Sequence, residues 1–452
     1  MQYFKFEKNV EIRACKLLDS ETIKELWSGF CSLSSSADIT ECEDMTISIG
    51  KKQAVELNDD EEYICRIGED GITVAARDEK ALMRGFISLI CNIENKEKNV
   101  FKIECGDIHG KFTVANRMVH ICIFPETPLS FFEKLMRLCG SLQFTHAIIE
   151  FWGMIKYDIL GELSYPHAFS KEQIRPIIDF AKNMGMEIIP MFNHLGHASA
   201  CRITSGKHVV LDQNPSLAYL FSPDGWCWSI TKDEVWELLR TIRYELYELC
   251  GEGEYFHIGC DEAYSIEKGC NTNEELCKYL SELTNEIVKE GRTPIIWGDM
   301  LIPHKIWDEK SDRTYSEEKI AKRLNSLANE TVIADWQYDT TEIPVRSAEY
   351  FSKTKFRVLG CPWYGYNNIN AYIESTKKLK LYGIMDTTWH TVGVKIGSLL
   401  ECAKLCGLSE NHITKYSRND SACAALARKS YPRVLPYEET GFVKEQVREI
   451  AK

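Results

Sequence analysis

The stretch Tyr255-Phe256-His257-Ile258-Gly259-Cys260-Asp261-Glu262 joins a short apolar run to a glycine and two adjacent carboxylates. The run from Tyr255 to Ile258 predicts a buried strand that ends where Gly259 lets the chain turn. Two acids at the end of a buried strand are costly, because each charge loses hydration and each raises the pKa of the other. Such a pair is typical of a site for proton or charge chemistry, although the start of a helix also favours acids.

Seven further apolar runs of similar length accompany this one, and segments of helical length and amphipathic pattern fill most of the gaps between them. The eight runs cover residues 118–123, 147–151, 187–192, 255–258, 294–297, 332–334, 356–359 and 382–385. Eight β/α repeats of this size predict a (β/α)8 TIM barrel. An open doubly wound sheet is the alternative, but it favours fewer strands and a glycine-rich phosphate turn, which the sequence lacks.

The residues before the barrel predict a small α/β domain. An alternating strand at 62–67, a turn at Glu69-Asp70-Gly71 and a second strand at 72–76 lead into a helix that Asp78 can cap. We therefore expect an N-terminal α/β non-catalytic domain over residues 1–111. A catalytic (β/α)8 barrel over 112–400 and a short C-terminal helical extension over 401–452 complete the expected organisation.

Composition narrows the class of protein. The chain has 452 residues and a net charge of −13, which argues against binding to nucleic acid or an anionic membrane, since both favour a positive surface. No run of about 18 uncharged apolar residues is present, so no membrane span is expected. The 18 cysteines form no CxxC pair and the N-terminus does not resemble a signal peptide, which together predict reduced thiols and a cytoplasmic location.

The expected carboxyl ends of the barrel strands, where active sites of this fold lie, are rich in aromatic, acidic and amide side chains. These residues are Glu150, Trp152, Asn193, His194, His197, Asp261, Glu262, Trp297, Asp299, Asp335, Trp336, Tyr338, Trp363, Tyr364, Tyr366, Asp386, Trp389 and His390. Aromatic faces stack on sugar rings, and carboxylates and amides bind sugar hydroxyls. A single tryptophan at such a position more often serves packing, but several together predict a carbohydrate pocket.

The stretch 257–262, His-Ile-Gly-Cys-Asp-Glu, resembles the His-x-Gly-x-Asp-Glu signature of glycoside hydrolase family 20, the β-N-acetylhexosaminidases. The resemblance extends over about residues 1–400. Further similar segments are Ala-Asn-Arg at 115–117, Asn-His-Leu-Gly-His at 193–197, Ile-Trp-Gly-Asp at 296–299 and Thr-Trp-His at 388–390.

The resemblance implies an exo-acting retaining hydrolase that removes terminal β-linked N-acetylglucosamine or N-acetylgalactosamine from an oligosaccharide or glycoconjugate, without a cofactor. Members of this family use substrate-assisted catalysis, in which the sugar's own acetamido oxygen attacks the anomeric carbon to form an oxazolinium. Glu262 would then act as general acid and base, and Asp261 would stabilise the developing positive charge. Tyr364, or else Tyr366, would bind the acetamido carbonyl.

The resemblance also implies a set of sugar-binding residues, among which Arg117 would hold O3 and O4. The others are Asn193, His197, His257, Trp297, Trp336, Tyr338, Trp363 and Trp389. Three positions depart from the family pattern, namely Asn193, Asn367 and Thr391, and they leave the choice between gluco and galacto substrates open.

Two other functions remain open from the residues alone. A metal-dependent hydrolase on the same barrel would use His194, His197 and Asp261. No third ligand lies near His194 and His197 at a spacing typical of metal sites, so no metal is expected there. A carbohydrate-binding protein without turnover is the second alternative.

Overall fold

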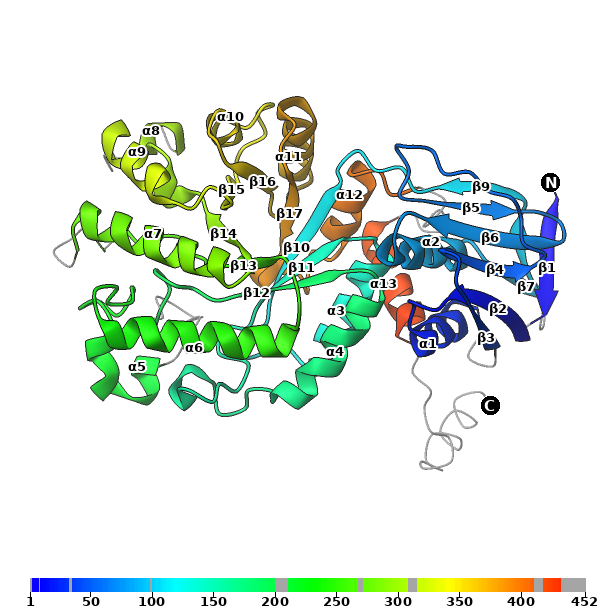
Figure 1. Cartoon of the computed structure of the whole chain (residues 1–452), viewed down its shortest axis with the longest axis horizontal. Coiled ribbons are helices and arrows are strands. Elements are labelled where there is room, and N and C mark those ends of the chain that lie inside the picture. The colour runs from blue at the N-terminus through cyan, green and yellow to red at the C-terminus, as the bar shows by residue number, and fades with distance from the viewer. Residues whose placement is uncertain are drawn as a thin grey trace, which may run out of the picture.

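The computed structural model describes residues 2–7, 9–31, 35–97, 100–199, 210–264, 266, 271–307, 315–409 and 418–431. Within this part of the chain, eight parallel strands close into a barrel, and a smaller α/β domain packs beside one end of it (Figure 1). The predicted (β/α)8 TIM barrel with a preceding α/β domain is thereby confirmed. No described helix combines the length and the hydropathy that crossing a membrane requires.

The N-terminal domain contains two sheets. Its strands are β1 (Tyr3–Glu7), β2 (Asn9–Cys15), β3 (Ser36–Cys42), β4 (Thr46–Gly50), β5 (Tyr63–Ile67), β6 (Gly71–Ala76), β7 (Glu94–Glu97), β8 (Val100–Glu104) and β9 (Gly106–His109). One sheet has the order β3-β2-β4-β6-β5-β9 and the other β1-β8-β7. Helices α1 (Ser20–Phe30) and α2 (Glu79–Cys91) pack on the larger sheet. The predicted hairpin is present as β5 and β6, and the Asp78 side chain caps α2 by accepting from the Ala81 N–H.

The barrel strands follow the predicted runs with small shifts at their ends. They are β10 (Asn116–Cys122), β11 (His146–Glu150), β12 (Glu187–Met191), β13 (Tyr255–His257), β14 (Thr293–Trp297), β15 (Val332–Trp336), β16 (Arg357–Cys361) and β17 (Gly383–Thr387). Each strand pairs in parallel with the next, and β10 pairs with β17 to close the barrel. Parallel closure places every carboxyl end on one rim, which positions the site described below.

The longer helices of the barrel cover the outside of the strands, and two four-residue helices lie in the connections. They are α3 (Leu129–Ser141), α4 (Lys171–Asn183), α5 (Val210–Gln213), α6 (Asp233–Cys250), α7 (Asn273–Lys289), α8 (His304–Trp307), α9 (Glu317–Ser326), α10 (Arg346–Ser352), α11 (Tyr366–Leu379) and α12 (Gly397–Leu405). Helix α6 illustrates why they form, since its buried residues Val235, Leu239, Ile242, Leu246 and Leu249 recur every three to four positions and make one apolar face.

The expected C-terminal extension is helical in its described part. Helix α12 runs across residue 400, and α13 (Asn419–Ser430) packs against α3, α12 and α1. Residues 432–452 lie outside the described residues. The C-terminal segment therefore contacts both the barrel and the N-terminal domain, and the three domain boundaries stay predictions.

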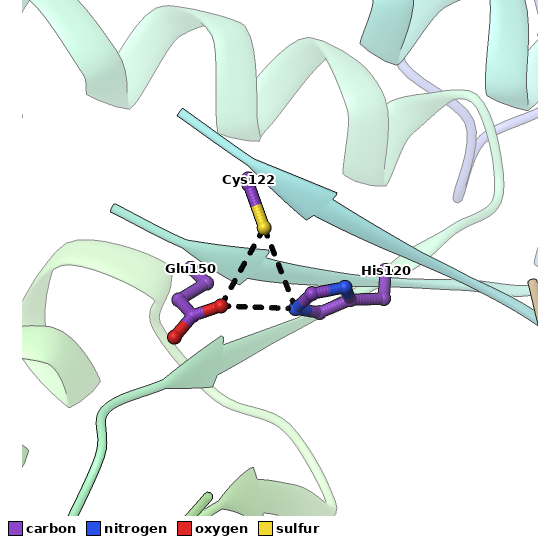
Figure 2. Close-up of side chains that lie close together, drawn as sticks. All are labelled: His120, Cys122 and Glu150. Carbon is purple, nitrogen blue, oxygen red and sulfur yellow. Dashed lines mark hydrogen bonds and ion pairs between the residues drawn. The ribbon is translucent and has the colours of Figure 1, made fainter. Parts of the chain in front are cut away.

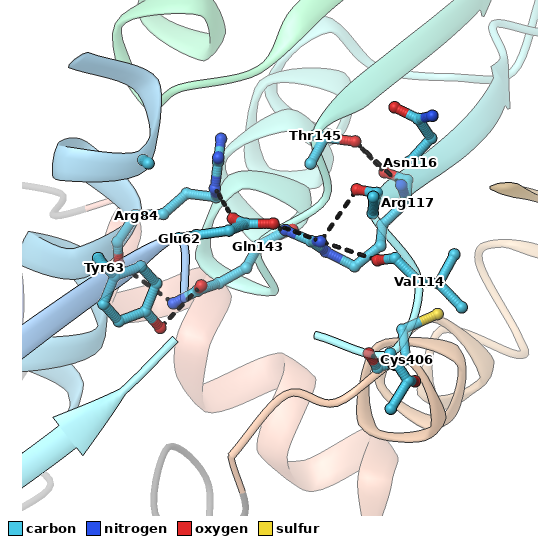
Figure 3. A network of polar contacts seen from close by, with 12 residues as sticks. Glu62, Tyr63, Arg84, Val114, Asn116, Arg117, Gln143, Thr145 and Cys406 are labelled. Carbon is cyan, nitrogen blue, oxygen red and sulfur yellow. Dashed lines mark hydrogen bonds and ion pairs between the residues drawn. The ribbon is translucent and has the colours of Figure 1, made fainter. Parts of the chain in front are cut away.

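Arg117 lies at the amino end of β10, where the barrel meets the N-terminal domain (Figure 3). Its guanidinium pairs with the Glu62 carboxylate at 2.8 and 3.1 Å and donates to the carbonyl oxygens of Val114, Ala115 and Gln143. The expectation that Arg117 binds the sugar is wrong, because the residue stands at the opposite end of its strand from the rim that carries the pocket.

Arg117→Met should lower the free energy of unfolding by about 3 kcal/mol, because it leaves the partly buried Glu62 carboxylate and three carbonyl groups with fewer partners. Urea unfolding measures this loss. Arg66→Met is the matched control, since Arg66 pairs with Asp107 on the surface and its removal should cost about 1 kcal/mol or less. A variant at Arg117 with normal stability and a raised KM would restore the sugar-binding role.

Candidate active site

A cavity of about 450 Å³ opens at the carboxyl ends of the barrel strands. This volume falls within the range of small-molecule sites. The residues that line it are Trp152, His197, Asp261, Glu262, Trp336, Tyr338, Trp363, Trp389 and His390. The structure thus brings together seven of the expected catalytic and sugar-binding residues, together with Trp152 and His390 from the same set of strand ends.

The two adjacent carboxylates share one histidine. The Nε2 atom of His197 lies 3.1 Å from Oδ2 of Asp261 and 3.3 Å from Oε2 of Glu262. The Asp261 side chain is 7% exposed, whereas the Glu262 side chain is 43% exposed. The pair is therefore asymmetric, with one acid enclosed and the other reaching into the open part of the pocket.

The backbone around these acids has a conformation that side chains rarely adopt. The φ angles are 69° at Cys260, 48° at Glu262 and 58° at His197. Positive φ at residues with a Cβ costs free energy of order 1–3 kcal/mol each, and such positions cluster at functional sites. Trp152, Tyr364 and Trp389, at other strand ends of the same rim, also have positive φ.

Two glycines allow the segment after β12 to approach the segment after β13. A Cβ on Gly196 would lie 2.2 Å from the carbonyl oxygen of Asp261, and one on Gly259 would lie 2.4 Å from Oδ1 of Asn193. Any side chain at either position would separate the two segments. The glycines are thus what permits His197 to reach both carboxylates.

Asp299 holds the backbone of the acid pair from below. Its Oδ2 accepts the Glu262 N–H at 2.8 Å and the Tyr264 hydroxyl at 3.1 Å. Burial, and then the charge of Asp261, raise the pKa of Asp299 to about 7. The sequence placed Asp299 at the end of its strand, but its role was missed because the hydrogen bond to Glu262 depends on the tertiary structure.

Trp226 is a residue of the site that the sequence did not indicate. Its indole Nε1 donates to the Glu262 carbonyl at 2.8 Å, and its ring centroid lies 4.3 Å from that of His197. It belongs to the long connection before α6, which has no periodic pattern to reveal it. Trp226 therefore packs against the His197 imidazole and fixes the backbone carbonyl of Glu262.

Aromatic side chains form the remaining walls. The Trp389 indole donates to the Tyr338 hydroxyl at 2.8 Å, and the Tyr338 ring stacks on Trp336 with centroids 5.0 Å apart. Trp363 meets Tyr338 edge to face at 5.2 Å, and its indole donates to Oγ1 of Thr391 at 2.9 Å. Thr391, one of the departures from the family pattern, thus orients an aromatic wall.

Tyr364 and Tyr366 do not line the cavity. Tyr364 is 37% exposed with its ring edge-on to Trp363, and Tyr366 is 49% exposed at the first residue of α11. The expectation that one of them reaches the acetamido group does not match this placement. Tyr338 is the tyrosine that lines the pocket.

Three other expected sugar-binding residues lie beneath the pocket and do not line it. Trp297 is fully buried in the barrel interior, 4.6 Å from the His257 ring. His257 accepts the Gly259 N–H at Nδ1, and Asn193 donates from Nδ2 to the Glu150 carboxylate. These residues support the wall and the strand ends from inside the barrel.

His194 and His197 face different surroundings. His194 is fully buried, with Nδ1 2.8 Å from the Phe192 carbonyl and Nε2 3.4 Å from the Arg243 guanidinium of α6. Burial and Arg243 lower the pKa of His194 to about 3, so its imidazole is neutral. Because both ring nitrogens of His194 face groups other than His197 and Asp261, the metal site that would combine these three residues is wrong.

Comparisons with known proteins agree with this geometry. Residues 152–362 match the model described as the catalytic domain of glycosyl hydrolase family 20. Hexosaminidase D of Bos taurus is 25% identical over 203 residues, which cover 41% of this chain and 56% of that protein. Hexosaminidase D of Homo sapiens is 26% identical over 201 residues, which cover 41% of this chain and 40% of that protein. The matches thus span about half the length of these relatives.

Solved structures show the same fold. A chitobiase from Flavobacterium johnsoniae superposes with a TM-score of 0.65 at 15% identity, over 96% of this chain and 72% of that chain. A family 20 β-N-acetylhexosaminidase from Streptomyces coelicolor gives 0.65 at 13% identity, over 97% and 94%. Both the N-terminal domain and the barrel are thus part of the shared architecture.

Asp299 should make the protein less stable as pH rises from about 4 to about 7. In this window the unfolded chain releases the proton of this carboxyl while the folded chain, whose pKa is about 7, retains it. Urea unfolding at several pH values should show a shallower decline for Asp299→Asn than for the unmodified chain.

Asp335→Asn is a second test of the same effect, because burial also raises the pKa of Asp335 to about 7 while its partners are Ser347 and Tyr372. Both variants should flatten the stability profile. Identical pH profiles of Asp299→Asn and the unmodified chain would contradict the assignment.

Proposed function

The chain is a divergent member of glycoside hydrolase family 20, and we propose that it hydrolyses terminal β-linked N-acetylhexosamine from oligosaccharides or glycoconjugates. The observation that carries the proposal is the joint placement of Asp261, Glu262 and His197 at one pocket whose other walls are aromatic. Aromatic walls suit a pyranose ring and the methyl group of an acetamido substituent. A cytoplasmic location stays a prediction.

The adjacent acids favour substrate-assisted catalysis. A retaining enzyme with two carboxylates needs them about 5 Å apart on opposite sides of the glycosidic bond. Among the described residues that line the pocket, Asp261 and Glu262 are the carboxylates, and they are neighbours in sequence. The acetamido oxygen of the substrate would then attack the anomeric carbon while the bond to the leaving oxygen breaks, giving an oxazolinium that water opens with retention.

The difference in exposure supports separate roles for the two acids. Glu262, the more exposed acid, donates a proton to the leaving oxygen and then accepts one from the attacking water. Asp261, the enclosed acid, accepts the acetamido N–H and stabilises the positive charge that develops on the ring. His197 lies within 3.3 Å of both and keeps their oxygens in place.

Tyr338 takes the role that the sequence suggested for Tyr364. Its hydroxyl accepts from the Trp389 indole, so its own proton can be donated to the acetamido carbonyl. Burial raises the pKa of Tyr338 well above its usual value, which keeps that proton on the hydroxyl. Trp336, Trp363 and Trp389 would confine the acetamido group and prevent it from swinging away from the anomeric carbon.

Glu262→Gln should lower kcat for 4-nitrophenyl N-acetyl-β-glucosaminide or the galacto equivalent by about 10²–10⁴-fold, because it removes the proton donor and acceptor. Release of 4-nitrophenol measures the rate. Glu254→Gln is the control, since Glu254 immediately precedes β13, at the end of that strand opposite to Glu262. Unchanged activity of Glu262→Gln would end the assignment. Sugar binding by calorimetry without any release by the unmodified chain would select a binding protein.

Tyr338→Phe should lower kcat by about 10- to 100-fold, because the developing charge on the acetamido group loses one hydrogen bond. Tyr364→Phe removes the same hydroxyl from a tyrosine that does not line the pocket and should remain close to the unmodified rate. A larger loss of kcat in Tyr364→Phe than in Tyr338→Phe would assign the role to Tyr364 instead.

Substrate assistance also makes a prediction for inhibitors. A thiazoline that mimics the oxazolinium should inhibit at a far lower concentration than N-acetylhexosamine, because a site complementary to the reacting state binds its analogue more tightly. The inhibition constants of the two compounds give the comparison. Equal potency, or turnover of a plain β-glucoside at the rate of the acetamido sugar, would argue for a different mechanism.

A further inference from the structure

Three side chains of different chemistry converge between the first two barrel strands (Figure 2). His120 and Cys122 belong to β10, and Glu150 ends β11. All three are buried, and their ligand atoms lie within 4.8 Å of one another. The expected catalytic scheme uses none of them.

The separations between these atoms are those of neighbouring ligands on one small cation. Nε2 of His120 lies 3.3 Å from Oε2 of Glu150, Sγ of Cys122 lies 3.5 Å from the same oxygen, and the nitrogen and sulfur are 3.9 Å apart. Tetrahedral zinc, with bonds of about 2.0–2.3 Å, separates nitrogen, oxygen and sulfur ligands by about 3.4–3.6 Å. A direct charged hydrogen bond between imidazolium and carboxylate would be shorter, about 2.8 Å.

The surroundings orient two of the three groups. Asn193 donates from Nδ2 to Oε1 of Glu150, which directs the other oxygen, Oε2, toward the histidine and the cysteine. The His120 ring packs edge to face against Trp389 at 4.6 Å and Trp297 at 5.7 Å. Fixed outer contacts of this kind hold metal ligands in a binding geometry.

We propose that His120, Cys122 and Glu150 form a binding site for one divalent cation of the zinc class. A thiolate, an imidazole and a carboxylate together select zinc or cobalt over magnesium or calcium. Three protein ligands leave one position of a tetrahedral ion for water or another group. The positive ion would compensate the charge of the buried Glu150 carboxylate and the Cys122 thiolate.

The site lies directly behind the sugar pocket, because the His120 ring contacts Trp389, which itself lines that pocket. An ion that holds the imidazole would thereby hold the Trp389 wall. The proposal does not depend on the proposed hydrolysis, and the catalytic steps above do not pass through the metal.

Metal content of the untagged chain tests the site directly. The chain is dialysed against metal-free buffer, and zinc is then added. Mass spectrometry of the metal should give about one tightly bound zinc ion per chain, beyond any ion that is held weakly. Replacement by cobalt should produce the near-ultraviolet absorption of a thiolate bound to cobalt. Cys122→Ser should abolish that absorption, and Cys139→Ser, which removes a buried thiol of α3, should keep it.

Glu150→Gln provides a second variant if Cys122→Ser fails to fold, because glutamine keeps the shape and the acceptor for Asn193. It should weaken zinc binding by at least about 10-fold in competition with a chromophoric chelator. Absence of stoichiometric zinc from the unmodified chain, or a cobalt spectrum that Cys122→Ser leaves unchanged, would overturn the proposal. Hydrolysis by a chain without metal would leave the proposed function intact, so the two failures are distinguishable.

Discussion

The site depends on holding two adjacent carboxylates at one pocket edge, and the imidazole of His197 is the group that both of them contact. Like charges this close raise the free energy of the folded chain unless a donor or a cation compensates them. The unusual backbone angles at Cys260 and Glu262 and the close approach at Gly196 all serve that contact. The barrel supplies the rigid frame that this local strain requires.

The sequence predicted the barrel because its strands are short apolar runs separated by amphipathic helices, a pattern that follows from burial alone. It also predicted the acid pair, since both residues come from one continuous stretch. Arg117 was misplaced because a seven-residue strand spans about 20 Å, so a residue near its start lies far from the rim. To predict whether a side chain reaches the rim, one must know where its strand ends. Hydrophobic periodicity locates the ends of strands poorly.

The aromatic wall shows a second limit of the sequence. Tyr338 and Tyr364 both follow barrel strands, yet it is the contacts of Tyr338 with Trp336 and Trp389 that hold this tyrosine at the pocket wall. Trp226 lies in an irregular connection, where no pattern marks a side chain that contacts the site. Contacts between segments that are distant in the sequence depend on the tertiary structure, so a single sequence does not predict them.

The Arg117–Glu62 ion pair has a consequence for how the molecule is built. Glu62 also accepts from Arg84 of α2, so one carboxylate of the N-terminal domain serves a guanidinium from each side of the interface. A barrel expressed without residues 1–111 would lose the carboxylate that pairs with Arg117 at its base. The N-terminal domain thus stabilises the base of the barrel through a charge that the barrel does not itself supply.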